Sequence, residues 1–503
     1  MPPMLPAHFL QLLGEMGLSR WGAWYSCRQG VNMEVDMGNV ENASAAMRTT
    51  KTVKSLPMPK VWAFAVGQFG WALLSGIISN WLVYFYQPDS ETISQGQTVF
   101  VPQGLAVLGV VTVVGGITAF ARFFDAFVDP AVASLSDRCT SKSGRRMPFL
   151  KFAALPLALV TVLVFWSPIN DTSWINGAFL FATVIGYYIA LTFCTPYNAL
   201  IAELGHDSKQ QLTISTAISF TWVAGTAIAY VAPVIWAGFV PGLGRVNAIR
   251  LTFTIMAAIA FVCMLVPPLT IKERDYVNSQ PTSESTIESL KQTFGDGEFR
   301  KFVCSDVVYW VAITTFQTGL PFFVTSLLKL PETTTTIYFV LMTAVSVLFY
   351  MPVNVLANRV GKKRILLVAF VIFTCAFAFA GALGSGLLAA IPPMAQGLIL
   401  SIVGAIPMAA FGILPQAIVA NIADASSKTT GQDRQGMFYA ARTFAMKMGQ
   451  SVAMLLFTGV STIGMASGAG YRIAAVCAAV LCGIGGVVFA FYNERKVLDV
   501  LES

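Results

Sequence analysis

Histidine is almost missing from this sequence, and charged residues are scarce. Among 503 residues there are two histidines, His8 and His206, and 11% of the chain is charged. Neither histidine falls in an apolar segment, so a histidine-based metal site or a Ser-His-Asp triad cannot be assembled there. The eight cysteines are scattered without a C-x-x-C pair. We therefore expect a protein that is not an enzyme and holds no resident cofactor or structural metal.

Apolar residues are abundant instead. They make up 55% of the chain, and the mean hydropathy is +0.67, which lies outside the range of soluble globular proteins. The net charge of +7 comes from basic residues that cluster in short loops between apolar runs, a pattern that orients membrane proteins and does not indicate nucleic-acid binding. The composition predicts a multi-pass protein of the lipid bilayer, which we expect to be monomeric.

Apolar segments of about twenty residues, each long enough to cross a bilayer as a helix, follow one another through most of the chain. They predict an all-α integral membrane protein with twelve transmembrane helices. The predicted segments are 61–86, 104–135, 149–167, 175–202, 212–237, 249–271, 302–328, 335–357, 364–384, 394–420, 436–462 and 472–492.

Composition divides the chain into parts. Residues 1–57 contain no spanning run and are expected to form a disordered extension. A polar stretch at 272–300 separates the first six segments from the last six and predicts a cytoplasmic linker. The two halves are then 58–271 and 301–492, and 493–503 form a short cytoplasmic tail.

The loops indicate the orientation of the chain. Basic residues crowd the second loop of each half, which predicts that both termini lie in the cytoplasm. If the organism is bacterial, we expect the protein in the inner membrane. Arg245 falls on the outer side and is interpreted as an isolated charge. Tryptophans near segment ends, among them Trp166 and Trp236, match the belts that line membrane interfaces.

The two halves repeat each other. The second segment ends with Pro130 and is followed by an Asp-Arg pair and a Gly-Arg-Arg, while the eighth ends with Pro352 and is followed by Asn-Arg and Gly-Lys-Lys. Two six-helix halves in parallel repeat predict the major facilitator fold, in which solute is handled between the halves near the middle of the membrane.

Charged side chains lie inside the second segment, where their insertion is costly. Asp125 and Asp129 are four residues apart, so on a helix they share one face and repel each other. A positive group must compensate them: a small cation, a proton, Arg122 one turn earlier, or a basic residue of another helix. Pro130 also frees the carbonyl of Ala126 for coordination. The alternative is a static network that only locks helices together.

Lys447 is a candidate for that basic partner. It lies about eleven residues, or roughly 16 Å, into the segment 436–462, too deep for its side chain to reach the interface easily. Pairing across the halves with the two acids would neutralise all three groups. In the alternative, the lysine reaches the cytoplasmic edge of a tilted helix.

The run R-x-x-D-A-x-x-D-P at Arg122 to Pro130, followed by S-D-R and G-R-R-x-P-F, resembles the glycoside-pentoside-hexuronide:cation symporter family. The resemblance covers about residues 60–492. It implies that Asp125 and Asp129 bind Na⁺, Li⁺ or H⁺ and that Lys447 lies near them.

The family's galactoside site is not repeated here. Its acids correspond to Ala72 and Cys194, and its tryptophan of the fourth segment to Asn198. The remaining candidates for solute contacts are polar and aromatic residues of several segments, each of which could instead serve helix packing. They are Gln68, Trp71, Asn80, Tyr197, Asn198, Trp222, Asp306, Trp310, Gln317 and Gln416. Asp306, near the start of its segment, could also cap that helix.

Two loops resemble the gating motif of the major facilitators, whose charges latch the halves in one state. The simpler interpretation is orientation charge with lipid headgroup contact. The residues concerned are Asp137, Arg138, Gly144, Arg145, Arg146, Arg359, Gly361 and Lys362.

Together these features predict a secondary transporter that couples Na⁺ or H⁺ to symport of a small polar solute, a sugar or glycoside. Two alternatives stay open: symport of a lysolipid or another amphiphile, and a membrane sensor of the same fold that does not transport. The intact acids and lysine argue against the sensor.

Overall fold

The structure is a computed structural model. It describes residues 55–277, 293–430, 435–464 and 467–502, except 108, 110, 138, 140, 142, 206 and 207. The expected N-terminal extension up to residue 54, most of the expected linker, and Arg138 therefore lie outside the described residues.

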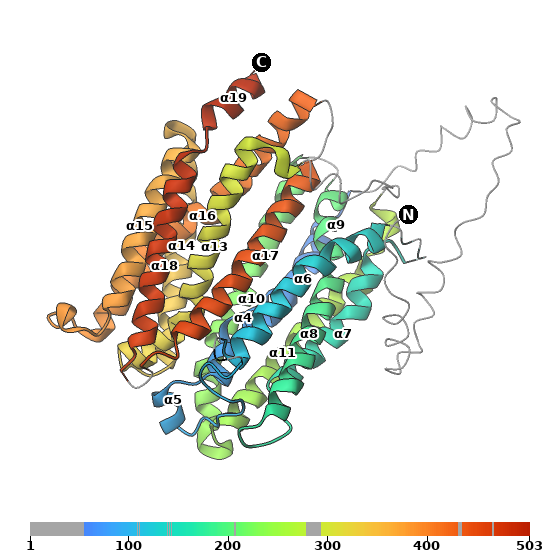
Figure 1. Ribbon diagram of the computed structural model, residues 1–503. Coiled ribbons are helices and arrows are strands. Elements are labelled where there is room, and N and C mark those ends of the chain that lie inside the picture. The colour runs from blue at the N-terminus through green and yellow to red at the C-terminus, as the bar shows by residue number, and fades with distance from the viewer. Residues whose placement is uncertain are drawn as a thin grey trace, which may run out of the picture.

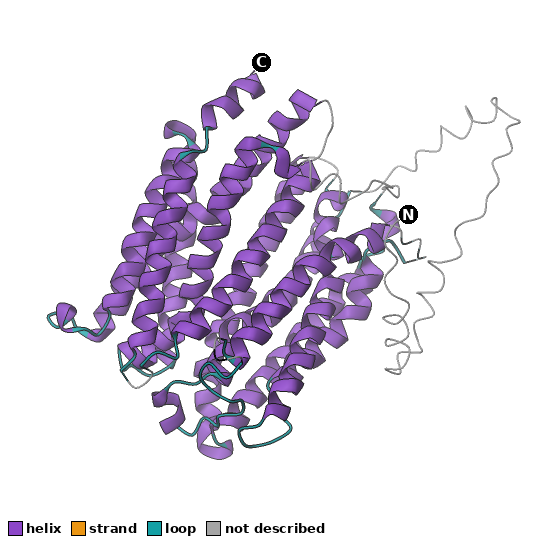
Figure 2. Cartoon of the chain, viewed as in Figure 1, coloured by secondary structure: helices purple, strands orange, loops and turns teal. Residues whose placement is uncertain are grey.

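Twelve long helices of 18 to 38 residues build the described part of the chain (Figures 1 and 2). The N-terminal half holds α4 (Met58–Tyr86), α6 (Val113–Asp137), α7 (Met147–Val164), α8 (Trp174–Cys194), α10 (Ser208–Leu243) and α11 (Arg245–Thr270). The C-terminal half holds α13 (Gly297–Phe322), α14 (Thr333–Val360), α15 (Lys362–Ala382), α16 (Pro393–Thr430), α17 (Gln435–Val460) and α18 (Ala469–Ala490). Short elements between them are α5 (Ser90–Ser94), α9 (Pro196–Leu204), η1 (Glu273–Asp275), η2 (Phe323–Leu327), η3 (Gly386–Leu388) and α19 (Glu494–Glu502).

Local chemistry explains several of the helix boundaries. Pro59 occupies the first turn of α4, where its missing N–H costs nothing. Asp296 caps α13 by accepting a hydrogen bond from the backbone N–H of Phe299. Pro196 cannot donate to the helix that precedes it, and α8 accordingly ends at Cys194 before α9 begins.

The halves form two bundles side by side (Figure 1). They meet where α6 packs along α17 and α10 packs along α14, with a smaller contact between α4 and α13. α9 and α19 lie at one end of the molecule and α5 at the other (Figure 1). We call these the α19 end and the α5 end.

Ten of the described helices are long and apolar enough to cross a membrane. α6 and α17 are not among the ten, and these are the helices that carry Asp125, Asp129 and Lys447. With solved structures of the same fold reported below, the expected all-α membrane architecture is confirmed.

Details of the expected segments differ from the structure. The second segment was predicted from residue 104, but α6 begins at Val113, and the described residues before it (104–107, 109, 111 and 112) are not helical and include one isolated bridge between Val107 and Val111. The fourth was predicted as one helix and is broken at Thr195. Trp236, expected in the interface belt, is buried between helices.

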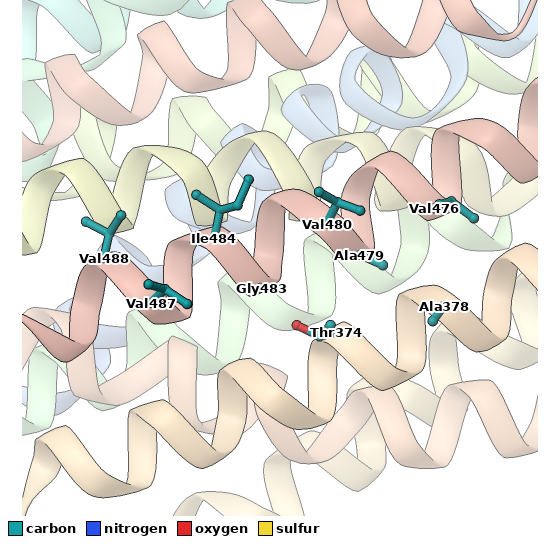
Figure 3. A pocket seen from close by; sticks show the side chains of 9 residues that line it. All are labelled: Thr374, Ala378, Val476, Ala479, Val480, Gly483, Ile484, Val487 and Val488. Carbon is teal, nitrogen blue, oxygen red and sulfur yellow. The ribbon is translucent and has the colours of Figure 1, made fainter.

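A shallow groove lies between α15 and α18, lined by Thr374 and apolar side chains such as Val476, Val480 and Ile484 (Figure 3). Its walls carry almost no polar groups and none of the charged residues of the interior. The groove therefore has the character of a surface that contacts lipid tails, and the polar side chains predicted to bind solute lie elsewhere.

Candidate functional site

The two acids of α6 and the lysine of α17 come together where the halves meet. Lys447 Nζ lies 2.6 Å from Asp125 Oδ2 and 2.5 Å from Asp129 Oδ2. The four-residue spacing puts both carboxylates on one face of α6, so a single ammonium reaches both. Each half of the molecule contributes one sign of charge, and the ion pairs therefore join the halves.

The environment of the two acids differs. Asp125 is 2% exposed, and its second oxygen, Oδ1, accepts a hydrogen bond of 2.7 Å from the hydroxyl of Thr192 on α8. The Asp129 side chain is 21% exposed, and its buried Oδ1 has no hydrogen-bond partner among the described residues. A carboxylate oxygen without a donor is costly to bury, so Asp129 has an unused coordination position beside Lys447.

Arg122 contacts neutral groups. Its Nη1 donates to Gln450 Oε1 at 2.6 Å and its Nη2 to Ser79 Oγ at 3.2 Å, and the guanidinium lies 5.6 Å from the ring centre of Tyr188. The sequence offered Arg122 as a charge partner of the acids, whereas in the structure its hydrogen bonds go to α17 and α4. Gln450 thus ties Arg122 to α17, three residues after Lys447.

Thr192 and Gln450 were not predicted from the sequence. Gln450 could have been noticed because it lies three residues from Lys447 on the same helix and shares its face. No local signal marks Thr192, since its contact with Asp125 depends on how α8 packs against α6.

The cation that this geometry holds is the Lys447 ammonium. The ammonium occupies the place between two carboxylates that a bound cation would take, and the oxygens of Asp125, Asp129 and Thr192 are hard donors of the kind that alkali cations and protons use. Charges this deep also penalise any state in which one of them lacks a partner. A cation entering the site would therefore have to displace Lys447 from at least one carboxylate.

Two polar candidates of α9, Tyr197 and Asn198, contact α4 within the N-terminal half. Gln68 Nε2 donates to Asn198 Oδ1 at 2.6 Å, while Gln68 Oε1 is buried without a partner in the described structure. The Tyr197 hydroxyl donates to the backbone carbonyl of Phe64. Tyr197 therefore serves packing between α4 and α9, and Gln68 keeps one free acceptor.

Among the candidates for solute contacts, three buried donors lack acceptors in the described residues: the indole nitrogens of Trp71 and Trp310 and the amide nitrogen of Asn80. Trp71 packs edge to face on Trp222 of α10, with ring centres 5.3 Å apart. Trp71 lies thirteen residues after the first residue of α4, and Trp310 lies thirteen after the first residue of α13, so they occupy corresponding positions of the two halves.

Asp306 is neither a helix cap nor unpaired. Arg442 of α17 binds it in a buried bidentate ion pair, with Nε 2.9 Å from Oδ2 and Nη2 3.1 Å from Oδ1. The cap of α13 is Asp296. Arg442, which was not singled out from the sequence, thereby satisfies the acid. The other two candidates are less enclosed, Gln317 half-buried on α13 and Gln416 exposed on α16.

The loop charges near the α19 end bind within their own halves. Arg145 and Arg146 form ion pairs of 2.7 and 2.6 Å with Glu203 of α9. The backbone N–H groups of both arginines donate to Glu273, which packs so close to Gly144 that a side chain there would collide with it. Gly144 also has a φ of +119°, which favours glycine.

The second loop is arranged in the same way. Gly361 has a φ of +100°, and the N–H groups of Lys362 and Lys363 donate to Glu494 of α19 at 2.9 and 3.0 Å. Arg359 is exposed in the last turn of α14, and Asp137 is the final residue of α6.

Curated symporters and transporters match parts of this chain. The E. coli inner membrane symporter YicJ is 27% identical over 225 residues, covering 44% of this chain and 47% of YicJ. The isoprimeverose transporter of Lactiplantibacillus pentosus is 24% identical, covering 52% and 51%, and the putative glycoside/cation symporter YagG of E. coli is 28% identical, covering 39% and 44%. The chain thus matches about half the length of such curated relatives.

Solved structures show the same fold at low sequence identity. The D-xylose-proton symporter superposes with a TM-score of 0.59 at 15% identity, covering 87% of this chain and 98% of that one. The nucleoside transporter NupG gives 0.58 at 14% identity, covering 86% and 100%. The family model described as "MFS/sugar transport protein" matches residues 63–492, which is most of the chain. The protein therefore belongs to the MFS/sugar transport protein family, as a transporter and not an enzyme.

Proposed function

We propose that the protein is a symporter that couples the entry of one monovalent cation, Na⁺ or H⁺, to the transport of a small polar solute, a sugar or glycoside. The observation that carries the proposal is the Lys447 ammonium held between Asp125 and Asp129 at the contact of the two halves. A site of this kind would bind a cation and also hold the two six-helix halves together.

The coupling follows from charge. With Lys447 in place, the ion pairs hold α17 against α6. A cation that binds the carboxylates takes over the neutralisation of the acids, so the ammonium is freed and the contact between the halves weakens. Occupancy of the cation site would then change the energy of moving one half against the other.

The solute class rests on the relatives and on the free polar atoms. Relatives described as glycoside/cation symporter and isoprimeverose transporter act on sugars by their names. The buried indole N–H groups of Trp71 and Trp310 and the free oxygen of Gln68 could bind hydroxyl groups, and indole rings suit the apolar faces of sugars.

The test is uptake by proteoliposomes that contain the purified protein, with a panel of labelled sugars, glycosides and lysolipids, with and without a Na⁺ or pH gradient. Asp125→Asn and Asp129→Asn are expected to lose stimulation by the cation. Asp171→Asn, a change in an exposed loop, is the matched control and should keep it. Full cation-stimulated uptake in both site variants would overturn the proposal, and stimulation seen only with lysolipids would replace the solute class.

The orientation is part of the proposal. The basic loops lie at the α19 end, so that end would face the cytoplasm and the α5 end the outside. Protease or labelling access to a tag placed after residue 502, in intact and opened cells, tests this assignment. The same experiment tests the cytoplasmic placement of the C-terminal tail.

A further inference from the structure

A second inter-half ion pair lies at the α5 end, far from the acids of α6. Glu332, the residue before α14, is 9% exposed and accepts from four donors of the N-terminal half. Arg245 Nη1 and Nη2 lie 3.0 and 2.5 Å from its two oxygens. Trp236 Nε1 donates at 2.6 Å and the Tyr84 hydroxyl at 3.0 Å. These residues, Glu332, Arg245, Trp236 and Tyr84, are called the Glu332 cluster below.

The cluster draws its groups from separate elements. Tyr84 is on α4, Trp236 on α10 and Arg245 at the start of α11, whereas Glu332 alone comes from the C-terminal half. Arg245 Nη1 also donates to Gln95 Oε1 at 3.2 Å, which orients the guanidinium. From the sequence, Arg245 was interpreted as an isolated outer charge and Trp236 as a belt residue, because nothing local to either residue points to Glu332.

Charge and burial make this contact strong. A bidentate arginine-carboxylate pair is about twice as strong as a neutral hydrogen bond, and here both carboxylate oxygens also receive a neutral donor. If the halves separated at this end without water entering, Glu332 and Arg245 would each be left as a buried unpaired charge. Separation therefore requires that both be hydrated together, which gives the contact two discrete states, closed and open.

Neighbouring contacts at the α5 end also join the halves. Asp89, which caps α5, accepts hydrogen bonds from the hydroxyls of Thr325 and Ser326 in η2. Gln87 Nε2 donates to Thr458 O and Ser461 Oγ of the C-terminal half, each at 2.9 Å. None of these contacts is an ion pair, so among the described contacts named at this end the attraction between opposite charges is that of Glu332 and Arg245.

Carboxylates at the α19 end behave differently. Glu203 and Glu273 bind groups of the N-terminal half, and Glu298 and Glu494 bind groups of the C-terminal half. In the portion of the chain that the structure describes, these four acids bind within a half at the α19 end, whereas Glu332 and Asp89 bind across the halves at the α5 end. The structure is thus a state in which the α5 end is tied by charge.

From these contacts we infer that Glu332 is the latch of the α5 end: it holds the halves together there, and its release from Arg245, Trp236 and Tyr84 accompanies opening of that end. The inference goes beyond the proposed coupling mechanism, because it concerns a different contact and holds whatever the solute and coupling cation are. It predicts a change in the balance of conformations that can be measured without any substrate.

The experiment is backbone hydrogen exchange, followed by mass spectrometry, of the full-length protein in lipid nanodiscs. Glu332→Gln keeps the size of the side chain and removes the charge. We expect exchange about tenfold faster in segments 230–245 and 328–340, since loss of a charged hydrogen-bond network lowers the local opening energy, with no such change in segments 145–160 and 362–375. The matched control is Glu298→Gln, a buried ion-paired acid at the α19 end that binds only its own half.

Two outcomes would overturn the inference. One is unchanged exchange at the α5 end in Glu332→Gln; the other is a uniform rise across both halves, which would make Glu332 a general stabiliser of the fold. If Glu332→Gln cannot be purified, Tyr84→Phe removes one donor and keeps the ion pair. It should raise exchange in the same segments by a smaller factor, and no rise there would count against the latch. Because no transport is measured, loss of cation coupling in Asp125→Asn would leave this result unaffected.

Discussion

Lys447 is bound by side chains of the opposite half of the molecule. Its ammonium has two carboxylate partners within 2.6 Å, and both come from the opposite half of the molecule. Such a group contributes to stability through the charges that it satisfies, and any variant that deletes it exposes the repulsion between Asp125 and Asp129. Stability and the proposed cation binding are therefore linked at this residue.

We predict that Lys447→Ala lowers the free energy of unfolding by about 3–5 kcal/mol, the usual loss when one partner of a buried ion pair is removed. Added Na⁺ or mild acid should raise the melting temperature of Lys447→Ala more than that of the wild type, because a cation or proton can replace the ammonium. Thermal unfolding of purified protein, titrated with NaCl at constant ionic strength and separately with pH, measures both effects.

Lys301→Ala serves as the control for this prediction. Lys301 pairs with Glu298 at 2.9 Å but is 43% exposed, so its removal should cost no more than about 1 kcal/mol. Equal destabilisation by the two variants, or no response of Lys447→Ala to either cation, would contradict the assignment of Lys447 as a built-in occupant of the cation site.

The charge partners of a residue could be predicted from the sequence where they depended on spacing within one helix. The i, i+4 arrangement of Asp125 and Asp129 required a shared positive partner, and the depth of Lys447 in its segment made it a candidate. The partners of Arg122, and the roles of Thr192 and Arg442, were not accessible, because each depends on a neighbouring helix whose rotation about its axis is set by packing.

At the scale of helices, the ion pair between Asp306 and Arg442 binds α13 to α17 inside the C-terminal half. Lys447 lies five residues beyond Arg442 on α17, and Trp310 lies four beyond Asp306 on α13. The pair thus fixes the helix that carries the lysine against the helix that carries a candidate for solute contact. In this buried, bidentate geometry both oxygens of Asp306 already accept a hydrogen bond from Arg442.

We predict that Arg442→Ala costs about 3–5 kcal/mol of stability, since it leaves the Asp306 carboxylate buried alone. The double variant Asp306→Leu with Arg442→Met should recover most of this loss, because apolar residues of similar volume can replace a buried pair. We further expect this double variant to retain solute uptake. Melting curves and the uptake assay provide the readout, and a stable double variant without uptake would instead give Asp306 a direct role in transport.

The sequence predicted the presence of the long helices better than it predicted where they begin and end. Runs of apolar residues anticipated all twelve long helices, since a bilayer admits few other structures for them. The break at Thr195 is chemically explained by Pro196, but a proline inside a membrane helix can also be accommodated, as Pro130 is in α6. Apolar composition alone extended the predicted second segment back to residue 104, although the described residues between 104 and 112 are not helical.

At the scale of the whole molecule, the two halves have the same helix arrangement but different side chains at corresponding contacts. When the six helices of one half are matched in order to the six of the other, the contact of α6 with α17 corresponds to that of α14 with α10. The first contact carries Asp125, Asp129 and Lys447, while the second carries a stacked pair of rings, Tyr230 and Phe339. In the described residues, ion pairs therefore cross the first of these two equivalent contacts, and the proposed cation response belongs to that contact.

The balance of charge at the α6–α17 contact has an electrical consequence. Arg122 and Lys447 carry two positive charges, and Asp125 and Asp129 two negative ones, so the empty cluster sums to zero. The membrane voltage then has little effect on the energy of moving the empty carrier, and it acts on the carrier that has bound a monovalent cation. We predict electrogenic uptake: an interior-negative potential of about 100 mV is worth roughly 2.3 kcal/mol per charge, or on the order of fiftyfold in accumulation ratio.

A potassium diffusion potential imposed with valinomycin on proteoliposomes measures this effect directly. Uptake that ignores the imposed potential would contradict a neutral empty cluster that takes up one cation per cycle. Lys447→Gln offers an internal comparison, since its empty cluster carries one net negative charge and the loaded one none. In that variant voltage would drive the return of the empty carrier instead of the entry of the loaded one, and the same four side chains would set which half of the cycle the membrane powers.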